Sequence, residues 1–329
     1  MKRNAKIAGT GMHVPGKVIP NSYFNETLGE DVDTWLRENV QIFERRWTEA
    51  DESTADLAEQ AGRKALVDGG IKAEDLDLII ISTDTPEYVS PSTASVVQHR
   101  LGATKAGTFD INTACAGFVT ALDMAAKYIA ADESYQHILV IGAYNMSKYL
   151  NQQDKKTVTL FADGAGAAVL SAHEGEEGML ASMLDTKGEY ADWMGIYAGG
   201  AKTPVTEEVL ESKTHLLQFV HKFPKELNPK TWTAMINELC KRAGIQPKDI
   251  GRFFITQINI NAIHETLDNL DIDHDKAEYV MHHYGYTGSA CIPMALDQAN
   301  KAGRIKRGDY LMFIGSGGGL AFAGALYKY

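Results

Sequence analysis

The chain has 329 residues and a mass of 36.0 kDa, a length that suits two average domains or one large fused unit. Its 43 Asp and Glu residues outnumber its 32 Lys and Arg residues, so the net charge is −11 and the surface repels phosphate backbones. Nucleic acid is therefore excluded as the expected main partner. A composition of 44% hydrophobic and 23% charged residues is typical of a folded globular chain with a sizeable core.

The sequence carries no targeting, membrane or metal signal that we recognise. No run of about 18 apolar residues predicts a membrane span, and the residues that follow Met1 do not resemble a signal peptide. The three cysteines, Cys115, Cys240 and Cys291, are too few and too scattered for a disulfide framework or a zinc site. We therefore expect a cytoplasmic protein with no membrane partner and no metal.

Short apolar runs bounded by Gly, Asp or Ser predict buried strands, and segments with helical spacing of Ala and Leu predict helices. In chain order the predicted elements are helix 53–68, strand 76–82, helix 117–131, strands 137–142 and 166–171, helix 231–243, and strands 253–256 and 310–315. This alternation favours an α/β fold with a mainly parallel sheet covered on both faces. The stretch 187–230 has weak periodicity and is predicted to be an inserted loop or cap.

A weak internal repeat relates the two halves of the chain at an offset of 174 residues. Ile79-Ile80-Ile81-Ser82 aligns with Phe253-Phe254-Ile255-Thr256, and Thr113-Ala114-Cys115 aligns with Thr287-Gly288-Ser289. The repeat predicts two copies of one α/β unit, over residues 1–172 and 173–329. The alternative is that the matches reflect only the apolar strands and Ala-rich helices that any two α/β halves share.

The segment Asp110-Ile111-Asn112-Thr113-Ala114-Cys115-Ala116-Gly117-Phe118 is the sharpest local feature. A strand ends there, small residues follow, and a helix begins near Cys115. A thiol at a helix N-terminus feels the positive end of the helix dipole and unpaired N–H groups, which lower its pKa and favour a nucleophilic thiolate. The alternative is a buried, inert cysteine.

Two glycine-rich segments lie farther along the chain. The first, Phe161-Ala162-Asp163-Gly164-Ala165-Gly166-Ala167-Ala168, lacks the lysine and the spacing of a phosphate-binding loop. The second, Gly315-Ser316-Gly317-Gly318-Gly319-Leu320-Ala321, follows a predicted strand. A triple glycine lets the backbone approach a reacting group and present an N–H to it, which is how an oxyanion hole is built. The alternative is a crowded turn between the last two strands.

Together and in this order, these segments resemble the β-ketoacyl-acyl-carrier-protein synthase III family of the thiolase superfamily. The resemblance runs nearly end to end, from Ile7-Ala8-Gly9-Thr10-Gly11 to Gly317-Gly318-Gly319. It implies a thiolase-like, five-layered αβαβα fold with two duplicated halves, assembled as a homodimer. It also implies that Cys115 takes an acyl group from acyl-CoA or from an acyl carrier protein. The backbone N–H groups of Cys115 and Gly318 would then form the oxyanion hole.

The chain departs from the family at two of the three catalytic positions. The family's triad is Cys-His-Asn, whereas Thr256 stands in the place of the histidine and Tyr286 in the place of the asparagine. In the family these two groups hold the enolate left when malonyl-carrier loses CO₂, and losing such a donor typically costs ~10²–10³ in rate. We therefore expect Cys115 to accept acyl groups and pass them to an acceptor, with weak decarboxylative condensation, in fatty-acid-like or secondary-metabolite biosynthesis.

The resemblance also implies a set of substrate-binding residues. Trp35 matches a tryptophan that stacks on the adenine of CoA, and Lys155 replaces an arginine near the nucleotide phosphates. Asn259 matches a residue that touches the pantetheine arm, and Gln257 is retained in the same segment. The arginine that would complete the stacking is Asn39 here, which favours a carrier-protein donor. The CoA or phosphopantetheine thioester is the substrate, and no cofactor is expected to be bound permanently.

Two residues of the predicted loop 86–91 have expected roles at the acyl tunnel. Ser90 falls where a bulky aromatic side chain often closes that tunnel, so its small size predicts a longer or wider acyl group than acetyl. Glu87 is a candidate base, because relatives that join two acyl chains use a glutamate near this position; the alternative is an ordinary loop carboxylate.

Three functional interpretations remain open from the sequence. The favoured one is an acyltransferase that forms a thioester on Cys115. The second is an ordinary decarboxylating synthase III with an altered triad, and the third is a non-catalytic subunit that pairs with an active synthase. A degenerate subunit has no reason to retain the nucleophile, its small-residue frame and Gly318 together, and this favours an enzyme.

Overall fold

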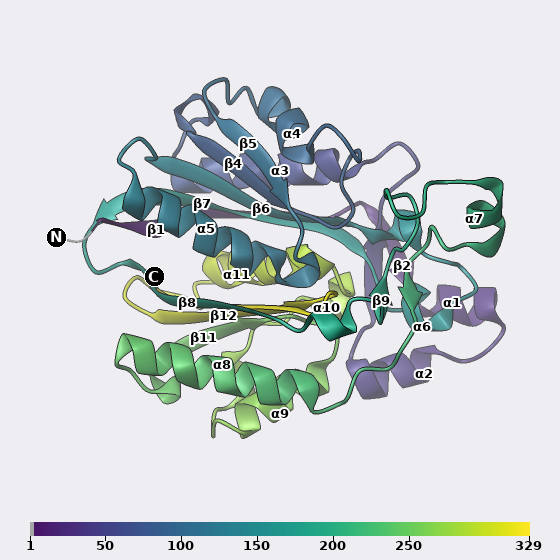
Figure 1. Cartoon of the computed structure of the whole chain (residues 1–329). Helices are drawn as coiled ribbons and strands as arrows, with labels where there is room; N and C mark the ends of the chain where they lie inside the picture. Colours follow the sequence, from purple (N-terminus) through teal and green to yellow (C-terminus); the bar gives the residue numbers. More distant parts are fainter. Residues whose placement is uncertain (1–2) are drawn as a thin grey trace.

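Two β-sheets lie one above the other, with helices above, between and below them, so that the molecule has five layers (Figure 1). The computed structural model describes residues 3–329, and the first two residues of the predicted N-terminal half lie outside it. The α/β class and the five-layered αβαβα arrangement implied by the resemblance are confirmed. The predicted mainly parallel sheet is wrong, because each of the two sheets is mixed.

The upper sheet has five strands and the lower sheet has four. The spatial order of the upper sheet is β1 (Arg3–His13), β7 (Asp163–Glu174), β6 (His137–Asn145), β4 (Leu78–Ser82) and β5 (Gly107–Ile111). The order of the lower sheet is β8 (Gly178–Thr186), β13 (Ala321–Lys328), β12 (Tyr310–Gly317) and β11 (Ile250–Ile255). Only β4–β5, β4–β6 and β11–β12 pair in parallel; the other pairs are antiparallel.

The two sheets share one topology. In each, a parallel pair (β4 with β6, or β11 with β12) is followed by two antiparallel strands, with β5 as the extra edge strand of the upper sheet. This shared order supports the proposal that the halves are two copies of one unit. The predicted division at residue 172 falls inside β7, which ends at Glu174.

Six main helices cover the sheets. Above the upper sheet lie α3 (Thr54–Gly69) and α4 (Thr93–Leu101), between the sheets α5 (Gly117–Ala131) and α11 (Cys291–Lys301), and below the lower sheet α8 (Leu227–Ala243) and α9 (Ile260–Asp268) (Figure 1). Three clusters of buried apolar residues fill the three gaps that hold these helices, and the middle cluster contains Cys115.

The helix ends follow local chemistry. The predicted helix 53–68 is α3, which begins after Ser53, whose hydroxyl accepts from the amide of Asp56, and ends before Gly70 in the left-handed region. Helix α8 begins four residues before the predicted Thr231. It does so because Pro229 lies in its first turn, where a missing N–H costs no hydrogen bond.

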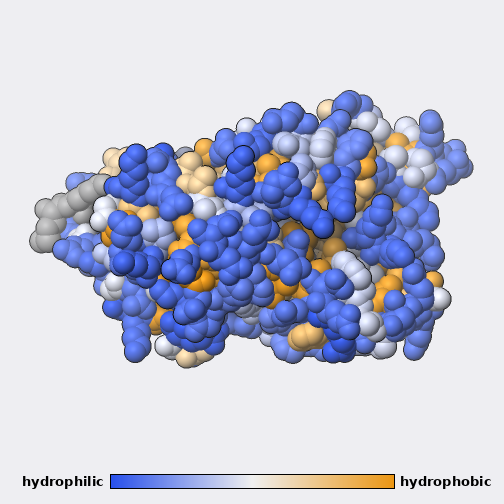
Figure 2. Space-filling model, turned by 90° about the horizontal axis from the view of Figure 1, so that it is seen from below, coloured by the Kyte–Doolittle hydropathy of each residue, from blue (hydrophilic) through white to orange (hydrophobic). Residues whose placement is uncertain are grey.

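Smaller elements gather at one end of the molecule (Figure 1). They include β2 (Lys17–Pro20) paired with β3 (Glu44–Trp47), α1 (Asn21–Leu28), α2 (Asp33–Trp35), the π-helical turn η1 (Leu36–Val40), α6 (Lys155–Val158) and α10 (Met281–Tyr284). The predicted inserted stretch 187–230 is largely irregular and holds β9 (Met194–Gly195), β10 (Gln218–Phe219) and α7 (Glu207–Ser212). The face below the lower sheet is mostly hydrophilic, as the charge leads one to expect (Figure 2).

One segment, Ala114–Ala131, is long and apolar enough to meet the criterion for a membrane-crossing helix, contrary to the expectation from the sequence. Of this segment 67% is buried inside the protein, where α5 packs between the two sheets. Its apolar character is thus that of a core helix that contacts protein on both sides.

Candidate active site

Cys115 lies on the short 3₁₀ turn η3 (Ala114–Ala116) that joins the end of β5 to α5. The side chain is 2% exposed and faces the middle layer. Directly after it, α5 begins at Gly117, and the hydroxyl of Ser82 at the end of β4 occupies the space that a Cβ on Gly117 would need. A glycine is therefore required for the helix to start this close to the sheet. The helix start near Cys115 agrees with the expectation from the sequence.

The triple glycine runs directly past the nucleophile. A Cβ on Gly317, the last residue of β12, would overlap the amide nitrogen of Cys115, and one on Gly315 would lie 2.7 Å from the Cα of Ala116. Gly318 follows and lies beside the carbonyl oxygen of Met194. The backbone of β12 thus packs closely against the turn that carries Cys115. The donor role of the Gly318 N–H stays a prediction.

Tyr286 lies beside Cys115. Its side chain is 1% exposed, and its hydroxyl is near enough to the sulfur of Cys115 to lower the pKa of that thiol. A parallel bridge to Phe161 holds its backbone, and the two rings lie 5.3 Å apart. Of the two substitutes for the family's histidine and asparagine, Tyr286 is therefore the one that the structure joins to Cys115.

The pKa of Cys115 differs from the expectation based on the helix terminus. Burial raises the pKa of the thiol well above its ordinary value, the negative charge of Asp84 raises it further, and the hydrogen bond from Tyr286 lowers it. The prediction of a lowered pKa is thus wrong, because it considered the helix and not the loss of water around the sulfur.

Thr256 and Gln257 are engaged with the backbone of the protein. The hydroxyl oxygen of Thr256 accepts from the amide of Ser316 at 2.8 Å. The amide of Gln257 donates to the carbonyl of Glu278 at 2.9 Å and accepts from the N–H of Val280 at 2.7 Å. These contacts support structural roles for both side chains. They give no support to the predicted substrate contact of Gln257.

The predicted nucleotide-binding residues border the end of the molecule that holds α1, α2 and α6. Trp35 is 53% exposed at the end of α2, so its ring is free to stack on a planar group. Lys155 pairs with both carboxylate oxygens of Glu30 at 3.0 Å, which reduces the positive charge available to a phosphate. Asn259 caps α9 through the amide of Asn261.

Asn261 ties this cap to the same end of the molecule, because its side chain donates to the carbonyl of Asn39 at 2.8 Å. The side chain of Asn39 in turn donates to the carbonyl of Trp35 at 3.0 Å. The structure thus brings the segments of Trp35 and Asn259 together. Their contacts with substrate remain predictions.

The loop after β4 carries Ser90 and Glu87. Ser90 is exposed and lines a cavity of about 440 Å³ together with Tyr88 and Val89, beside the free edge of β5. The Glu87 carboxylate accepts from the amide of Ala55 at 2.8 Å, in the first turn of α3. Helix N-termini favour such a carboxylate, so this contact supports a structural role for Glu87 rather than that of a base.

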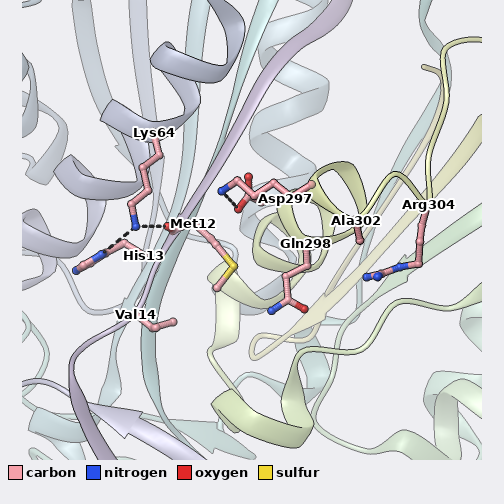
Figure 3. Close-up of a pocket in the computed structure, with 9 residues that line it drawn as sticks. Met12, His13, Val14, Lys64, Asp297, Gln298, Ala302 and Arg304 are labelled. Atoms are coloured by element: carbon pink, nitrogen blue, oxygen red, sulfur yellow. Dashed lines mark hydrogen bonds and ion pairs between the residues drawn. The ribbon is translucent and has the colours of Figure 1, made fainter.

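A cavity of about 550 Å³ lies between the end of β1 and α11 (Figure 3). Its charged groups are already occupied: Lys301 pairs with the buried Asp297 at 2.6 Å, and Arg304 pairs with Glu278 at 2.7 Å. Lys64 donates to the carbonyl of Met12 at 2.9 Å. None of the predicted site residues lines this cavity, and we assign no chemistry to it.

Two residues near Cys115 were missed by the sequence analysis. Asp84 follows β4 and raises the pKa of Cys115. Tyr144, at the end of β6, is 1% exposed, and both Asp84 and Cys115 raise the pKa of its hydroxyl. One signal was present for Asp84: it is a charged residue directly after a buried strand, at the edge of a parallel pair where binding sites form. Nothing in the sequence marked Tyr144.

Comparisons with known proteins agree with this geometry. Family models described as 3-oxoacyl-[acyl-carrier-protein (ACP)] synthase III and its C-terminal part match residues 109–188 and 240–329. A β-ketoacyl-[acyl-carrier-protein] synthase III of Caldanaerobacter subterraneus subsp. tengcongensis is 36% identical over 329 residues, covering 99% of this chain and 98% of its own. The crystal structure of 3-oxoacyl-[acyl-carrier-protein] synthase III from Aquifex aeolicus has a TM-score of 0.89 at 31% identity, covering 99% of this chain and all of its own. The priming β-ketosynthase of the R1128 polyketide pathway has a TM-score of 0.90 at 26% identity, covering 99% and 96%. The chain belongs to the 3-oxoacyl-[acyl-carrier-protein] synthase III family.

Proposed function

We propose that this protein is an acyltransferase that takes an acyl group from acyl-CoA or an acyl carrier protein onto Cys115 and passes it to an acceptor. The observation that carries the proposal is the contact between Cys115 and the glycine backbone at Gly317, beside the start of α5. A nucleophile next to exposed backbone N–H groups is the arrangement that acyl transfer requires. The thioester itself is the substrate, and no permanently bound cofactor takes part.

The chemical step is a thioester exchange. The bond between the Cys115 sulfur and the acyl carbon forms, the bond between that carbon and the sulfur of CoA or phosphopantetheine breaks, and the proton of Cys115 leaves on the departing thiol. The Tyr286 hydroxyl lowers the pKa of the Cys115 thiol and would so stabilise the thiolate that attacks. Backbone N–H groups of Cys115 and Gly318 would hold the negative charge on the acyl oxygen.

Intact mass measurement tests the acylation. The wild-type protein is incubated with a panel of acyl-CoAs and acyl carrier proteins, and the added mass is located by peptide mapping. Cys115→Ala should abolish the adduct, whereas Cys240→Ala, a buried thiol in α8 outside the site, should leave it unchanged. Adducts that persist in Cys115→Ala, or that map to Cys240 or Cys291, contradict the proposal.

Decarboxylative condensation is the step that we propose to be weak. Neither Thr256 nor Tyr286 reproduces the family's pair: Thr256 accepts from the Ser316 amide, and Tyr286 donates to Cys115. A combined loss of about 10³–10⁵ is expected, because two donors acting as a unit are not additive. Thr256→His with Tyr286→Asn should raise malonyl decarboxylation more than it raises acylation of Cys115. Condensation by the wild type at several turnovers per second would favour an ordinary synthase III.

Two features support the proposed homodimer. Strand β5 lies at the edge of the upper sheet, so its outer backbone groups are available to pair with another strand. The loop beside it exposes Val89 to 92% and Tyr88 to 54%, which is costly for apolar side chains unless they are covered. We propose that a second copy of the chain covers this surface. We also propose that the protein acts in the cytoplasm, in a pathway related to fatty-acid or polyketide synthesis.

A further inference from the structure

Asp84 carries a buried carboxylate oxygen that has no partner. The residue keeps partial exposure as a whole, yet its Oδ1 is fully buried and accepts no hydrogen bond from any residue in 3–329. No ion pair reaches it within that range. The other aspartate with a buried unpartnered oxygen, Asp123, at least pairs with Lys127 at 2.7 Å through its second oxygen. An unpaired buried carboxylate is costly and calls for a partner that arrives from outside the chain.

The loop that carries Asp84 is held in place at the mouth of the upper sheet. Next to Asp84, the amide of Thr83 donates to the carbonyl of Ile111 at the end of β5, at 3.2 Å. On its other side, the Thr85 hydroxyl accepts from the amide of Asn145 at the end of β6, at 2.9 Å. Asp84 is thus fixed where the carboxyl ends of β4, β5 and β6 meet, beside the turn that carries Cys115.

Two tyrosines and the thiol of Cys115 lie near enough to Asp84 for its charge to raise their pKa values. The charge of Asp84 acts on Cys115 of η3, on Tyr144 of β6 and on Tyr149 of η4 (Met146–Tyr149), the titratable groups that face it from these elements. All three have raised pKa values because of burial, so they are neutral at pH 7. The carboxylate is therefore the one negative charge among them.

We propose that Asp84 receives a protonated amine on the acyl chain, so that the group transferred to Cys115 is an aminoacyl group. This inference rests on the acyl transfer to Cys115 proposed above and specifies its substrate class. A carboxylate with aromatic neighbours is the combination that binds ammonium groups, whereas an apolar acyl chain would leave the carboxylate buried and unpaired.

Matched acyl-CoAs test the proposal. β-Alanyl-CoA and butyryl-CoA have the same chain length and differ by an ammonium in place of a methyl group, and 3-hydroxypropionyl-CoA is a neutral hydrogen-bond donor. Acylation rates of Cys115 are followed by intact mass for the wild type, Asp84→Asn and Asp84→Glu. The control is Asp75→Asn, which removes an exposed carboxylate before the other end of β4.

The wild type and Asp75→Asn should accept β-alanyl over butyryl groups by roughly tenfold to a hundredfold, the value of a hydrogen bond to a charged group. Asp84→Asn should abolish this preference while butyryl groups still reach Cys115, and Asp84→Glu should retain part of it. At pH values below about 6 the preference for β-alanyl groups should decrease, because burial raises the pKa of Asp84 to about 6 and the carboxylate is then protonated.

Three results would overturn the inference. Equal wild-type rates with β-alanyl and butyryl groups, or a preference unchanged in Asp84→Asn, exclude the ammonium contact while leaving acyl transfer intact. Faster transfer of the 3-hydroxypropionyl group than of the β-alanyl group assigns Asp84 to a neutral donor instead. Absence of any adduct on Cys115 with every donor, in protein shown to be folded by circular dichroism, rejects the proposed function and this inference with it.

Discussion

Asp84→Asn should stabilise the protein at neutral pH, and the gain should depend on pH. Burial raises the pKa of Asp84 from 3.8 to about 6, which means that the folded state resists ionisation of this carboxyl. Well below pH 3.8 the carboxyl is protonated in both the folded and the unfolded state, and no stability is lost. As the pH rises through 4 to 6 the unfolded state ionises first, so the stability of the folded state falls.

The size of the effect follows from the shift. A difference of about 2 pKa units corresponds to about 3 kcal/mol of unfolding free energy above pH 7, and to about half of that at pH 5. The partial exposure of Asp84 makes this an upper value. The asparagine side chain is neutral throughout, so the variant lacks this loss. Any cost of its own unpartnered amide is the same at both pH values and cancels in the comparison.

Urea unfolding of the wild type and of Asp84→Asn at pH 5 and pH 8, at one protein concentration, measures the effect. The free-energy difference between variant and wild type should favour the variant more at pH 8 than at pH 5, by about 1–1.5 kcal/mol. Asp75→Asn should show no such change. A difference that is equal at the two pH values, or larger at pH 5, would refute the reasoning, because Asp84 would then ionise without cost in the folded state.

Three further predictions concern the site and its surroundings. Tyr286→Phe removes the donor to Cys115, so it should raise the thiol pKa further and slow alkylation by iodoacetamide at pH 8 about tenfold; an unchanged rate would show that the hydrogen bond has no effect. Gly317→Ala places a Cβ on the amide of Cys115, so it should cost about 1–3 kcal/mol in urea unfolding and suppress acylation measured by intact mass. Gly200→Ala, whose Cβ would meet no neighbouring atom, is the control for crowding. Val89→Asp should convert the proposed dimer to a monomer by light scattering at micromolar concentration, and a dimer that persists would exclude this loop from the interface.

The local elements of the fold could be predicted from the sequence because local patterns define them. The predicted helix 117–131 matches α5 (Gly117–Ala131), since its apolar residues recur with helical spacing and small residues precede it. The predicted strand 310–315 matches β12 to within two residues. The position of Cys115 at a helix start follows from the same local information, whereas the approach of Gly317 to it is a contact between distant segments.

The direction of strand pairing depended on tertiary structure. Alternating helices and strands suggested parallel sheets, but β13 returns beside β12 through a turn of three residues, Gly318–Leu320, so the two strands pair antiparallel. The turn is too short for the crossover that a parallel pair needs. Periodicity records whether a strand is buried, not which neighbour it pairs with.

The chemistry of the site also depended partly on local sequence and partly on tertiary structure. The sequence by itself indicated the proposed nucleophile, because Cys115 and its small neighbours form one continuous segment. Only the tertiary structure decided the state of its thiol and the groups around it. Asp84, Tyr144 and Tyr286 come from separate strands and turns, and burial among them raises the pKa that the helix terminus alone would have lowered. Desolvation depends on how many distant segments exclude water from one atom, and no local sequence pattern contains that information.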